Sequence, residues 1–150
     1  MQHRLDLERQ IATRMNPLAR AWLRVADQTL AELGVSTSTG WALVHLQRLG
    51  HDARQSELAR AIGITEASLV RTLHRLESSG FVTRIADVED RRANRLRLTP
   101  EGVALASRID GRLIALRSEM LRDIPSDDLE RVIHVFDVVS ARFAEQLGRA

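Results

Sequence analysis

The 150-residue sequence contains no cysteine, no tyrosine and no lysine, and these absences limit what the protein can be. Without cysteine there is no disulfide framework, no thiol nucleophile and no cysteine-ligated zinc site. No apolar run approaches the roughly 18 residues that are needed to cross a bilayer. The first ten residues, MQHRLDLERQ, lack the apolar stretch of a signal peptide. A cytoplasmic protein with no membrane partner is therefore expected.

All 22 cationic side chains other than histidine are arginines, and they oppose 20 acidic residues. The net charge is only +2, yet the sequence pI is about 10.7, because almost nothing titrates between histidine and arginine. Residues 54–97 carry nine arginines against six acids, whereas residues 98–150 carry seven against nine. Because arginine forks onto phosphates and guanine edges, the middle of the chain is the candidate surface for nucleic acid.

Long amphipathic helices are predicted at both ends of the chain. The first stripe of apolar residues recurs every three or four positions and consists of Ile11, Met15, Leu18, Trp22 and Val25. Pro17 interrupts it, so that either a helix starts at Asn16-Pro17 or a longer helix is kinked there. Helix starts at Thr99-Pro100-Glu101 and at Pro125-Ser126 precede two further stripes, the last of which contains Phe136, Val139, Phe143 and Leu147.

The middle of the chain predicts three helices followed by a hairpin. The first runs from Ser38 or Thr39 to Gly50, and the second is capped by Ser56 and closed by Gly63. The third is capped by Thr65 and ends at Gly80. Two segments of period-two character, 81–85 and 95–98, are joined by a polar loop over 86–94. The predicted fold is mostly α with a small β-hairpin wing: a winged helix-turn-helix with long flanking helices.

In a helix-turn-helix the second helix lies in the major groove of DNA. Here that helix is predicted to expose Ser68, Arg71, Thr72 and Arg75. The alternative is a generic helical hairpin with a solvated arginine face, but the arginine-bearing hairpin that follows favours DNA.

The hairpin loop contains three acids and two arginines. We expect Asp90 to brace a neighbouring arginine while Arg91 or Arg92 reaches a minor groove; the alternative is a solvated turn. The acidic spacing matches no Ca²⁺ loop, and neither a metal nor a cofactor is predicted.

Two segments of the sequence, ELARAIGITEASLVRTLHRLESSGFVTR (57–84) and DRRANRLRLTPEG (90–102), resemble the MarR family of bacterial transcriptional regulators, and within it the SlyA-like branch. The resemblance covers essentially the whole chain, although about fifteen residues precede Asn16-Pro17, more than the SlyA-like pattern usually has. It implies a homodimer on a pseudo-palindromic operator, with DNA contacts from the residues of the helix and loop named above.

The resemblance also implies a division of the chain. Residues 1–35 and 100–150 would form dimerisation helices, and residues 36–99 the winged helix-turn-helix. The apolar stripes at the two ends have no large enough partner within one chain, which independently favours pairing of two copies. The expected interface comprises Ile11, Met15, Leu18, Phe136, Val139, Phe143 and Leu147.

A pocket for a small aromatic carboxylate is a further implication of the SlyA-like pattern. Its residues here would be Arg20, Trp22, Thr39, Trp41 and His45. An arginine can pair with a carboxylate while tryptophan and histidine stack on a ring. The alternative is two core tryptophans, one satisfied histidine and one solvated arginine.

The leading hypothesis is thus a DNA-binding transcriptional regulator that responds to a ligand. A winged-helix architectural or protein-interaction module without ligand sensing is the alternative. An enzyme is not expected, because the sequence has no clustered histidines, no glycine-rich phosphate loop and no suggestive Ser-His-Asp spacing.

Overall fold

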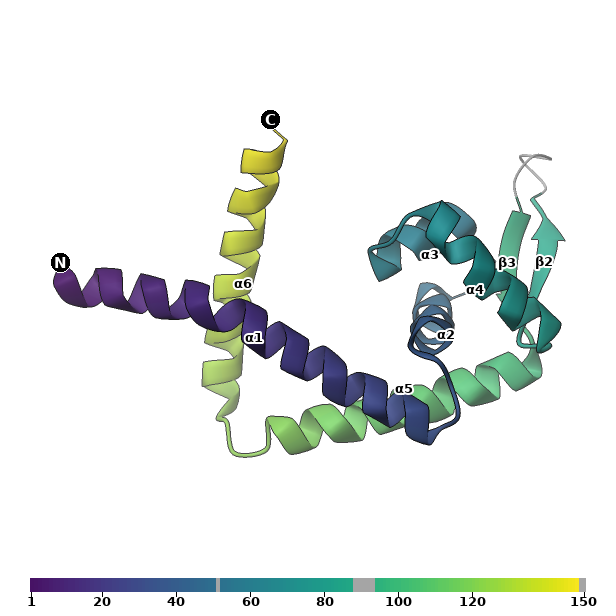
Figure 1. Cartoon of the computed structure of the whole chain (residues 1–150), viewed down its shortest axis with the longest axis horizontal. Helices are drawn as coiled ribbons and strands as arrows, with labels where there is room; N and C mark the ends of the chain where they lie inside the picture. Colours follow the sequence, from purple (N-terminus) through teal and green to yellow (C-terminus); the bar gives the residue numbers. More distant parts are fainter. Residues whose placement is uncertain (51, 88–93, 149–150) are drawn as a thin grey trace. The chain divides into compact units, whose positions relative to one another are not determined.

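The computed structural model describes residues 1–50, 52–87 and 94–148. These residues form helices and one small sheet (Figure 1). The elements in chain order are α1 (Gln2–Glu32), α2 (Thr37–Leu49), β1 (Ala53–Arg54), α3 (Gln55–Ile62), α4 (Glu66–Ser78), β2 (Val82–Ala86), β3 (Asn94–Leu98), α5 (Pro100–Met120) and α6 (Ser126–Leu147). The predicted fold class is confirmed. By internal contacts the chain divides into two compact units, residues 1–116 and 117–150.

Helix α1 is continuous from Gln2, with Pro17 inside it, so a helix start at Asn16-Pro17 is wrong. Proline lacks the N–H that would bond to the preceding turn, which weakens the helix at that point. Side-chain pairs one turn apart support the segment before it: Arg4 donates to Glu8 at 2.7 Å, and Gln10 donates to Asp6 at 2.8 Å. The first fifteen residues therefore lengthen α1.

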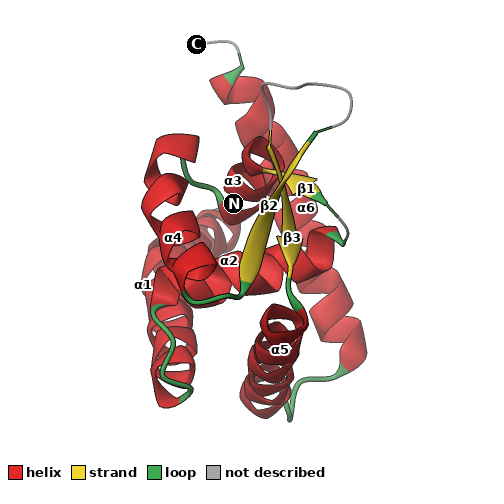
Figure 2. Ribbon diagram, turned by 90° about the vertical axis from the view of Figure 1, so that its right-hand side faces the viewer, coloured by secondary structure: helices red, strands yellow, loops and turns green. Residues whose placement is uncertain are grey.

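The sheet has three antiparallel strands in the order β1-β3-β2, with β3 in the centre (Figure 2). The predicted hairpin is confirmed, with Val82 opposite Leu98. The sequence did not predict β1, because two residues are too short to show an alternating pattern. Ala53 pairs with Leu96 and Arg54 with Arg95, which ties the start of α3 to the hairpin.

Helix boundaries in the middle of the chain follow their capping bonds. Thr65 caps α4 as predicted, accepting from the backbone N–H of Ser68 at 3.2 Å. The predicted start of α2 at Ser38 or Thr39 is slightly late, because Ser36 is the N-cap. The Ser56 cap is wrong: α3 begins at Gln55, where Glu57 accepts from the backbone N–H of Arg54 at 2.6 Å.

The core of the first unit is built largely from leucines. Its fully buried large aliphatic side chains are Leu30, Leu43, Val44, Leu46, Leu58, Leu69, Leu73, Leu76, Leu96 and Ile109. They come from α1 to α5 and from β3, so one core holds the helix-turn-helix, the hairpin and the start of α5 together. Helix α4 is thereby fixed along one side, and its other side faces solvent.

The start of α5 makes a close contact with the segment before the hairpin. The Thr99 hydroxyl donates to the carbonyl of Gly80 at 2.6 Å and accepts from the backbone N–H of Gly102 at 3.0 Å. The backbone N–H of Thr99 donates to the carbonyl of Phe81 at 3.0 Å. A Cβ atom on Gly102 would lie 2.0 Å from that Phe81 oxygen, so only glycine fits there.

Among the residues that the structure describes, none of the helices combines the length and apolar character that a bilayer span requires.

Candidate nucleic-acid interface and the pocket beside it

Helix α4 presents three of the four predicted DNA-contacting side chains to solvent. Ser68, Arg71 and Arg75 are exposed. Thr72 is only 7% exposed, and the expectation that it lies on the exposed face is wrong. Its position is three residues after Leu69 and four before Leu76, which places it on the side of the helix that packs on the core.

The two arginines of this face lie one turn apart on α4. In the part of the chain that the structure describes, neither Arg71 nor Arg75 has an acidic group within salt-bridge distance. Other arginines of this unit are paired with acids. Arg84 donates to Glu77 at 2.8 Å, and Arg97 donates to both carboxylate oxygens of Asp52 at 2.7 Å. The exposed face of α4 therefore keeps two positive charges available for an anionic partner.

The predicted wing residues Asp90, Arg91 and Arg92 lie outside the described residues. The strand ends next to this loop are described, and they contain an ion cluster that the sequence did not predict. The Asp87 side chain is 1% exposed and lies 3.1 Å from Arg54 and 3.1 Å from Arg95. The sequence does not predict this cluster because it does not predict β1, and only the pairing of β1 with β3 brings Arg54 beside Arg95.

A second ion pair supports the same edge of the sheet. Asp52, just before β1, holds Arg97 of β3 through the two hydrogen bonds given above. Hydrogen bonding to Asp52 raises the pKa of the Arg97 guanidinium, and the charge of Asp52 raises it further. Arg97 therefore remains charged while its guanidinium is engaged with Asp52.

The predicted ligand residues are only partly brought together. The rings of Trp41 and His45 have centroids 6.1 Å apart, as expected for side chains one turn apart on α2. Both are half-buried, as are Trp22 and Thr39, whereas Arg20 is exposed. Burial lowers the pKa of His45, and the positive charge of Arg48 lowers it further.

The lowered pKa of His45 predicts a pH dependence of stability. Because the folded state resists protonation of His45, the unfolded state binds more protons below the usual histidine pKa of about 6.5. We expect the free energy of unfolding to be highest above that pH and to fall as the pH drops towards the folded pKa of His45.

Urea unfolding at several pH values would measure this effect in the natural protein and in His45→Gln. The variant should show a weaker loss of stability on acidification, with His3→Gln, at an exposed position, as the matched control. An identical pH profile for the natural protein and His45→Gln would contradict the prediction.

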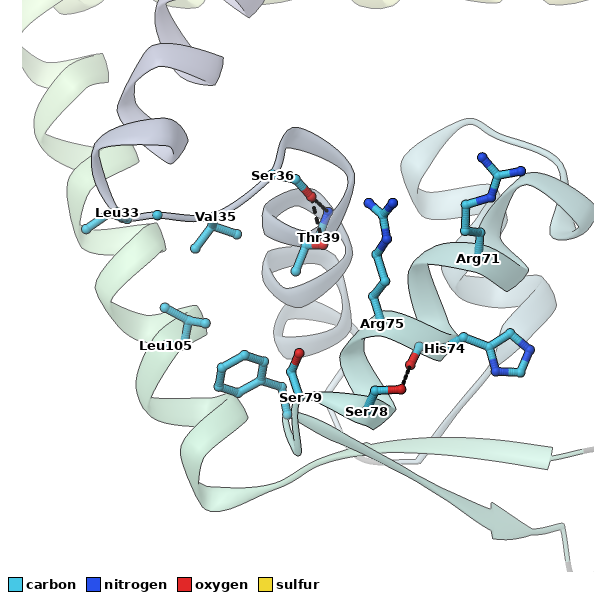
Figure 3. Close-up of a pocket in the computed structure, with 12 residues that line it drawn as sticks. Leu33, Val35, Ser36, Thr39, Arg71, His74, Arg75, Ser78, Ser79 and Leu105 are labelled. Carbon is cyan, nitrogen blue, oxygen red and sulfur yellow. Dashed lines mark hydrogen bonds between the residues drawn. The ribbon is translucent and has the colours of Figure 1, made fainter.

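An open pocket of about 630 Å³ lies beside the recognition face, between α4 and the turn that joins α1 to α2. Its lining residues are Leu33, Gly34, Val35, Ser36, Thr39, Arg71, His74, Arg75, Ser78, Ser79, Phe81 and Leu105. Of the five predicted ligand residues only Thr39 is among them. Figure 3 shows Arg75 extending from α4 towards the side where Ser36 and Thr39 lie, whereas His74 points away from them.

The predicted interface stripes are largely exposed to solvent in the single chain. The exposed fractions are 52% for Ile11, 62% for Leu18, 54% for Phe136, 55% for Phe143 and 77% for Leu147. Met15 is 41% exposed, and Val139 is half-buried. Helix α6 has 22 residues and buries none of them. These surfaces are large and apolar, which is typical of a site that another protein surface covers.

Comparison with known proteins identifies the fold. A model of the MarR family matches residues 41–93. The crystal structure of the transcriptional regulator PA3341 is 32% identical, with a TM-score of 0.82 over 90% of this chain and 98% of that chain. MarR family transcription regulator SP03579 is 23% identical, with a TM-score of 0.88 over 100% of this chain and 99% of its own.

CouR from Rhodococcus jostii RHA1, solved with p-coumaroyl-CoA bound, is 21% identical, with a TM-score of 0.76. The alignment covers 86% of this chain and 90% of CouR. The winged helix-turn-helix built from α3, α4 and the hairpin is thus shared with solved transcriptional regulators rather than with enzymes. Together with the resemblance to PA3341 over nearly the full length of both chains, this shows that the chain belongs to the MarR family of transcriptional regulators.

Proposed function

We propose that this regulator binds DNA sequence-specifically as a homodimer on a pseudo-palindromic operator. The observation that carries the proposal is the exposed face of α4, where Arg71 and Arg75 have no acidic partner in the described part of the chain. In a helix-turn-helix the N-terminal part of the second helix lies nearest to the base edges, which assigns base contacts to Ser68 and Arg71 and a backbone contact to Arg75. In the loop, Arg91 or Arg92 is assigned to the minor groove, and Asp90 is assigned to brace a neighbouring arginine.

The dimer is supported by the exposed stripes of α1 and α6. Two copies that cover Ile11, Leu18, Phe136 and Phe143 would remove a large apolar area from water, at about 25 cal/mol per Å². In this arrangement residues 1–35 and 100–150 hold the dimer together, and residues 36–99 bind DNA. Two symmetric lobes would read half-sites about one helical turn apart.

We further propose a place in the SlyA-like branch and modulation by a small aromatic carboxylate. The sequence assigns this ligand to Arg20, Trp22, Thr39, Trp41 and His45. Two observations support the aromatic part of such an effector: the ring contact between Trp41 and His45, and the aromatic thioester p-coumaroyl-CoA bound to the similarly folded CouR. The effector can weaken DNA binding only if it prefers a state of the protein that fits DNA poorly.

Arg71→Ala should weaken binding to the operator by about 1–3 kcal/mol, because a bidentate contact to a base edge is lost. The operator would first be selected from the protein's own genomic DNA, and fluorescence anisotropy would then measure affinity for operator and random duplexes at one salt concentration. Arg108→Ala, which removes an exposed arginine of α5, is the matched control.

The loss in Arg71→Ala should be larger on the operator than on random DNA, and Arg108→Ala should change neither affinity. An equal loss on both duplexes would contradict the base-reading role of Arg71. A natural protein that does not distinguish operator from random DNA would instead support an architectural module.

A further inference from the structure

The solvent-facing side of α4 carries a histidine between its two arginines. The His74 side chain is 70% exposed, and it lies three residues after Arg71 on the same face of the helix. At 100° per residue, it is at least about 100° away from each buried leucine of α4, namely Leu69, Leu73 and Leu76. Because Thr72 faces the core instead, His74 is the polar side chain exposed between Arg71 and Arg75.

We propose that His74, in its protonated form, contacts a phosphate of the DNA backbone, so that DNA binding takes up protons and strengthens as the pH falls. The inference rests on the proposed DNA-binding function and gives the same surface a regulation. In a helix-turn-helix the N-terminal part of the second helix lies nearest to the base edges. His74 lies one turn beyond Arg71, in the C-terminal half of α4, where a phosphate contact is expected.

The groups next to His74 leave its imidazole available to an anion. Glu77 is the acid within reach, with its carboxylate 3.9 Å from Nδ1 of His74, but the same carboxyl group accepts from Arg84 of β2 at 2.8 Å. An exposed pair as long as that between His74 and Glu77 contributes little. The Ser78 hydroxyl donates to the backbone carbonyl of His74 at 2.7 Å rather than to its ring.

The elements behind α4 add no ion pair to His74. Helices α2 and α3 pack against the leucine side of α4. In the described ranges, none of their charged side chains pairs with His74; these are His45, Arg48, Glu57 and Arg60. The turn between α1 and α2 lines the neighbouring pocket with uncharged residues. Arg71 and Arg75 therefore draw an anion to this surface, and the negative charge of a bound phosphate favours the imidazolium.

The expected effect follows from proton linkage. Histidine changes its charge between about pH 5 and pH 8, and each protomer of the dimer contributes one copy of His74. We expect the affinity for DNA to be about tenfold higher, or more, at about pH 5.5 than at about pH 7.5. The burial of His45 cannot produce this gain, because it makes acid destabilise the folded protein and so acts in the opposite direction.

Fluorescence anisotropy of the full chain with random and operator duplexes, at these two pH values and one salt concentration, measures the effect. His74→Gln keeps a polar side chain but takes up no proton, and its affinity should change by less than about threefold. His74→Arg, which is charged at both pH values, should bind tightly at both. His3→Gln removes an exposed histidine of α1 and should behave as the natural protein does. Circular dichroism would verify that every protein is folded at both pH values.

The salt dependence of binding provides a second readout. In the natural protein, the slope of log affinity against log salt should be steeper at the lower pH by about one for each protomer, and His74→Gln should lack this change. A pH-independent affinity of the natural protein, or an undiminished pH dependence in His74→Gln, would overturn the proposal. A gain on acidification that is confined to the operator would overturn the phosphate contact, because a phosphate is present in every sequence.

Failure of the proposed function gives a different result. Equal affinity for operator and random DNA would contradict sequence-specific binding, while the effect of pH on both duplexes would still support the role of His74. The absence of binding to either duplex at both pH values would overturn both proposals.

Discussion

Phe143→Asp is expected to abolish the folded dimer rather than release a stable monomer. Phe143 is 55% exposed in the single chain, and the helix that carries it buries none of its 22 residues. In the proposed dimer this side chain lies in the apolar seam, where an unpaired carboxylate costs several kcal/mol. A loss of about 3 kcal/mol would raise the dissociation constant of the dimer by more than a hundredfold.

Sedimentation velocity and circular dichroism at low micromolar protein would measure this effect. The natural protein should sediment as a dimer, and the variant should lose helix content or aggregate, because folding and pairing are coupled. Ala141→Asp is the matched control: it introduces the same charge on the same helix, at an angular position nearly opposite Phe143. A well-folded monomer of the natural protein at this concentration would contradict the obligate dimer.

Gly102→Ala is expected to destabilise the protein by about 2–3 kcal/mol, as overpacking of a tight contact does. The new Cβ would lie 2.0 Å from the carbonyl oxygen of Phe81, and that oxygen already accepts from the backbone N–H of Thr99. Either α5 must move away from the hairpin or the bond must break. Thermal unfolding should show a midpoint roughly 5–10 °C lower.

Gly111→Ala provides a control with the same chemistry in the same helix. A Cβ at Gly111 would meet no atom within 4 Å, so alanine should bring only its better helix propensity, worth about 0.5–1 kcal/mol. The two substitutions should therefore change stability in opposite directions. Equal effects at the two positions would mean that the contact between Gly102 and Phe81 does not limit the packing of α5.

Local sequence patterns predict the helices and strands that have periodically spaced apolar residues or a capping residue at their start. Thr65 predicts the start of α4 because its hydroxyl accepts from a backbone N–H of the first turn. Thr99, followed by Pro100, predicts the start of α5 in the same way. The sequence leaves the continuity of α1 open, since a proline inside a helix and a proline at its start look the same in sequence. Side-chain pairs between residues 4 and 14 support the segment before Pro17.

The candidate sites were less predictable, because they depend on contacts between residues far apart in the chain. Arg71 and Arg75 were found from their place on a recognition helix, but the core-facing orientation of Thr72 follows from how α4 packs on its neighbours. The pocket beside Arg75 combines residues 33–39 with residues 71–81 and Leu105, and no local spacing links these segments. Asp87 was missed for the same reason, since its two arginine partners are distant in sequence.

The short strand β1 determines which parts of the DNA-binding lobe can move independently. Ala53 and Arg54 pair with β3, and the buried Asp87 bridges Arg54 and Arg95 across that junction. Arg54, the residue before α3, is therefore paired with the central strand of the sheet, and this pairing ties the hairpin strands to the helix-turn-helix. If this lobe binds DNA as proposed, it moves as one unit, and its major-groove and minor-groove contacts in one half-site should be gained or lost together.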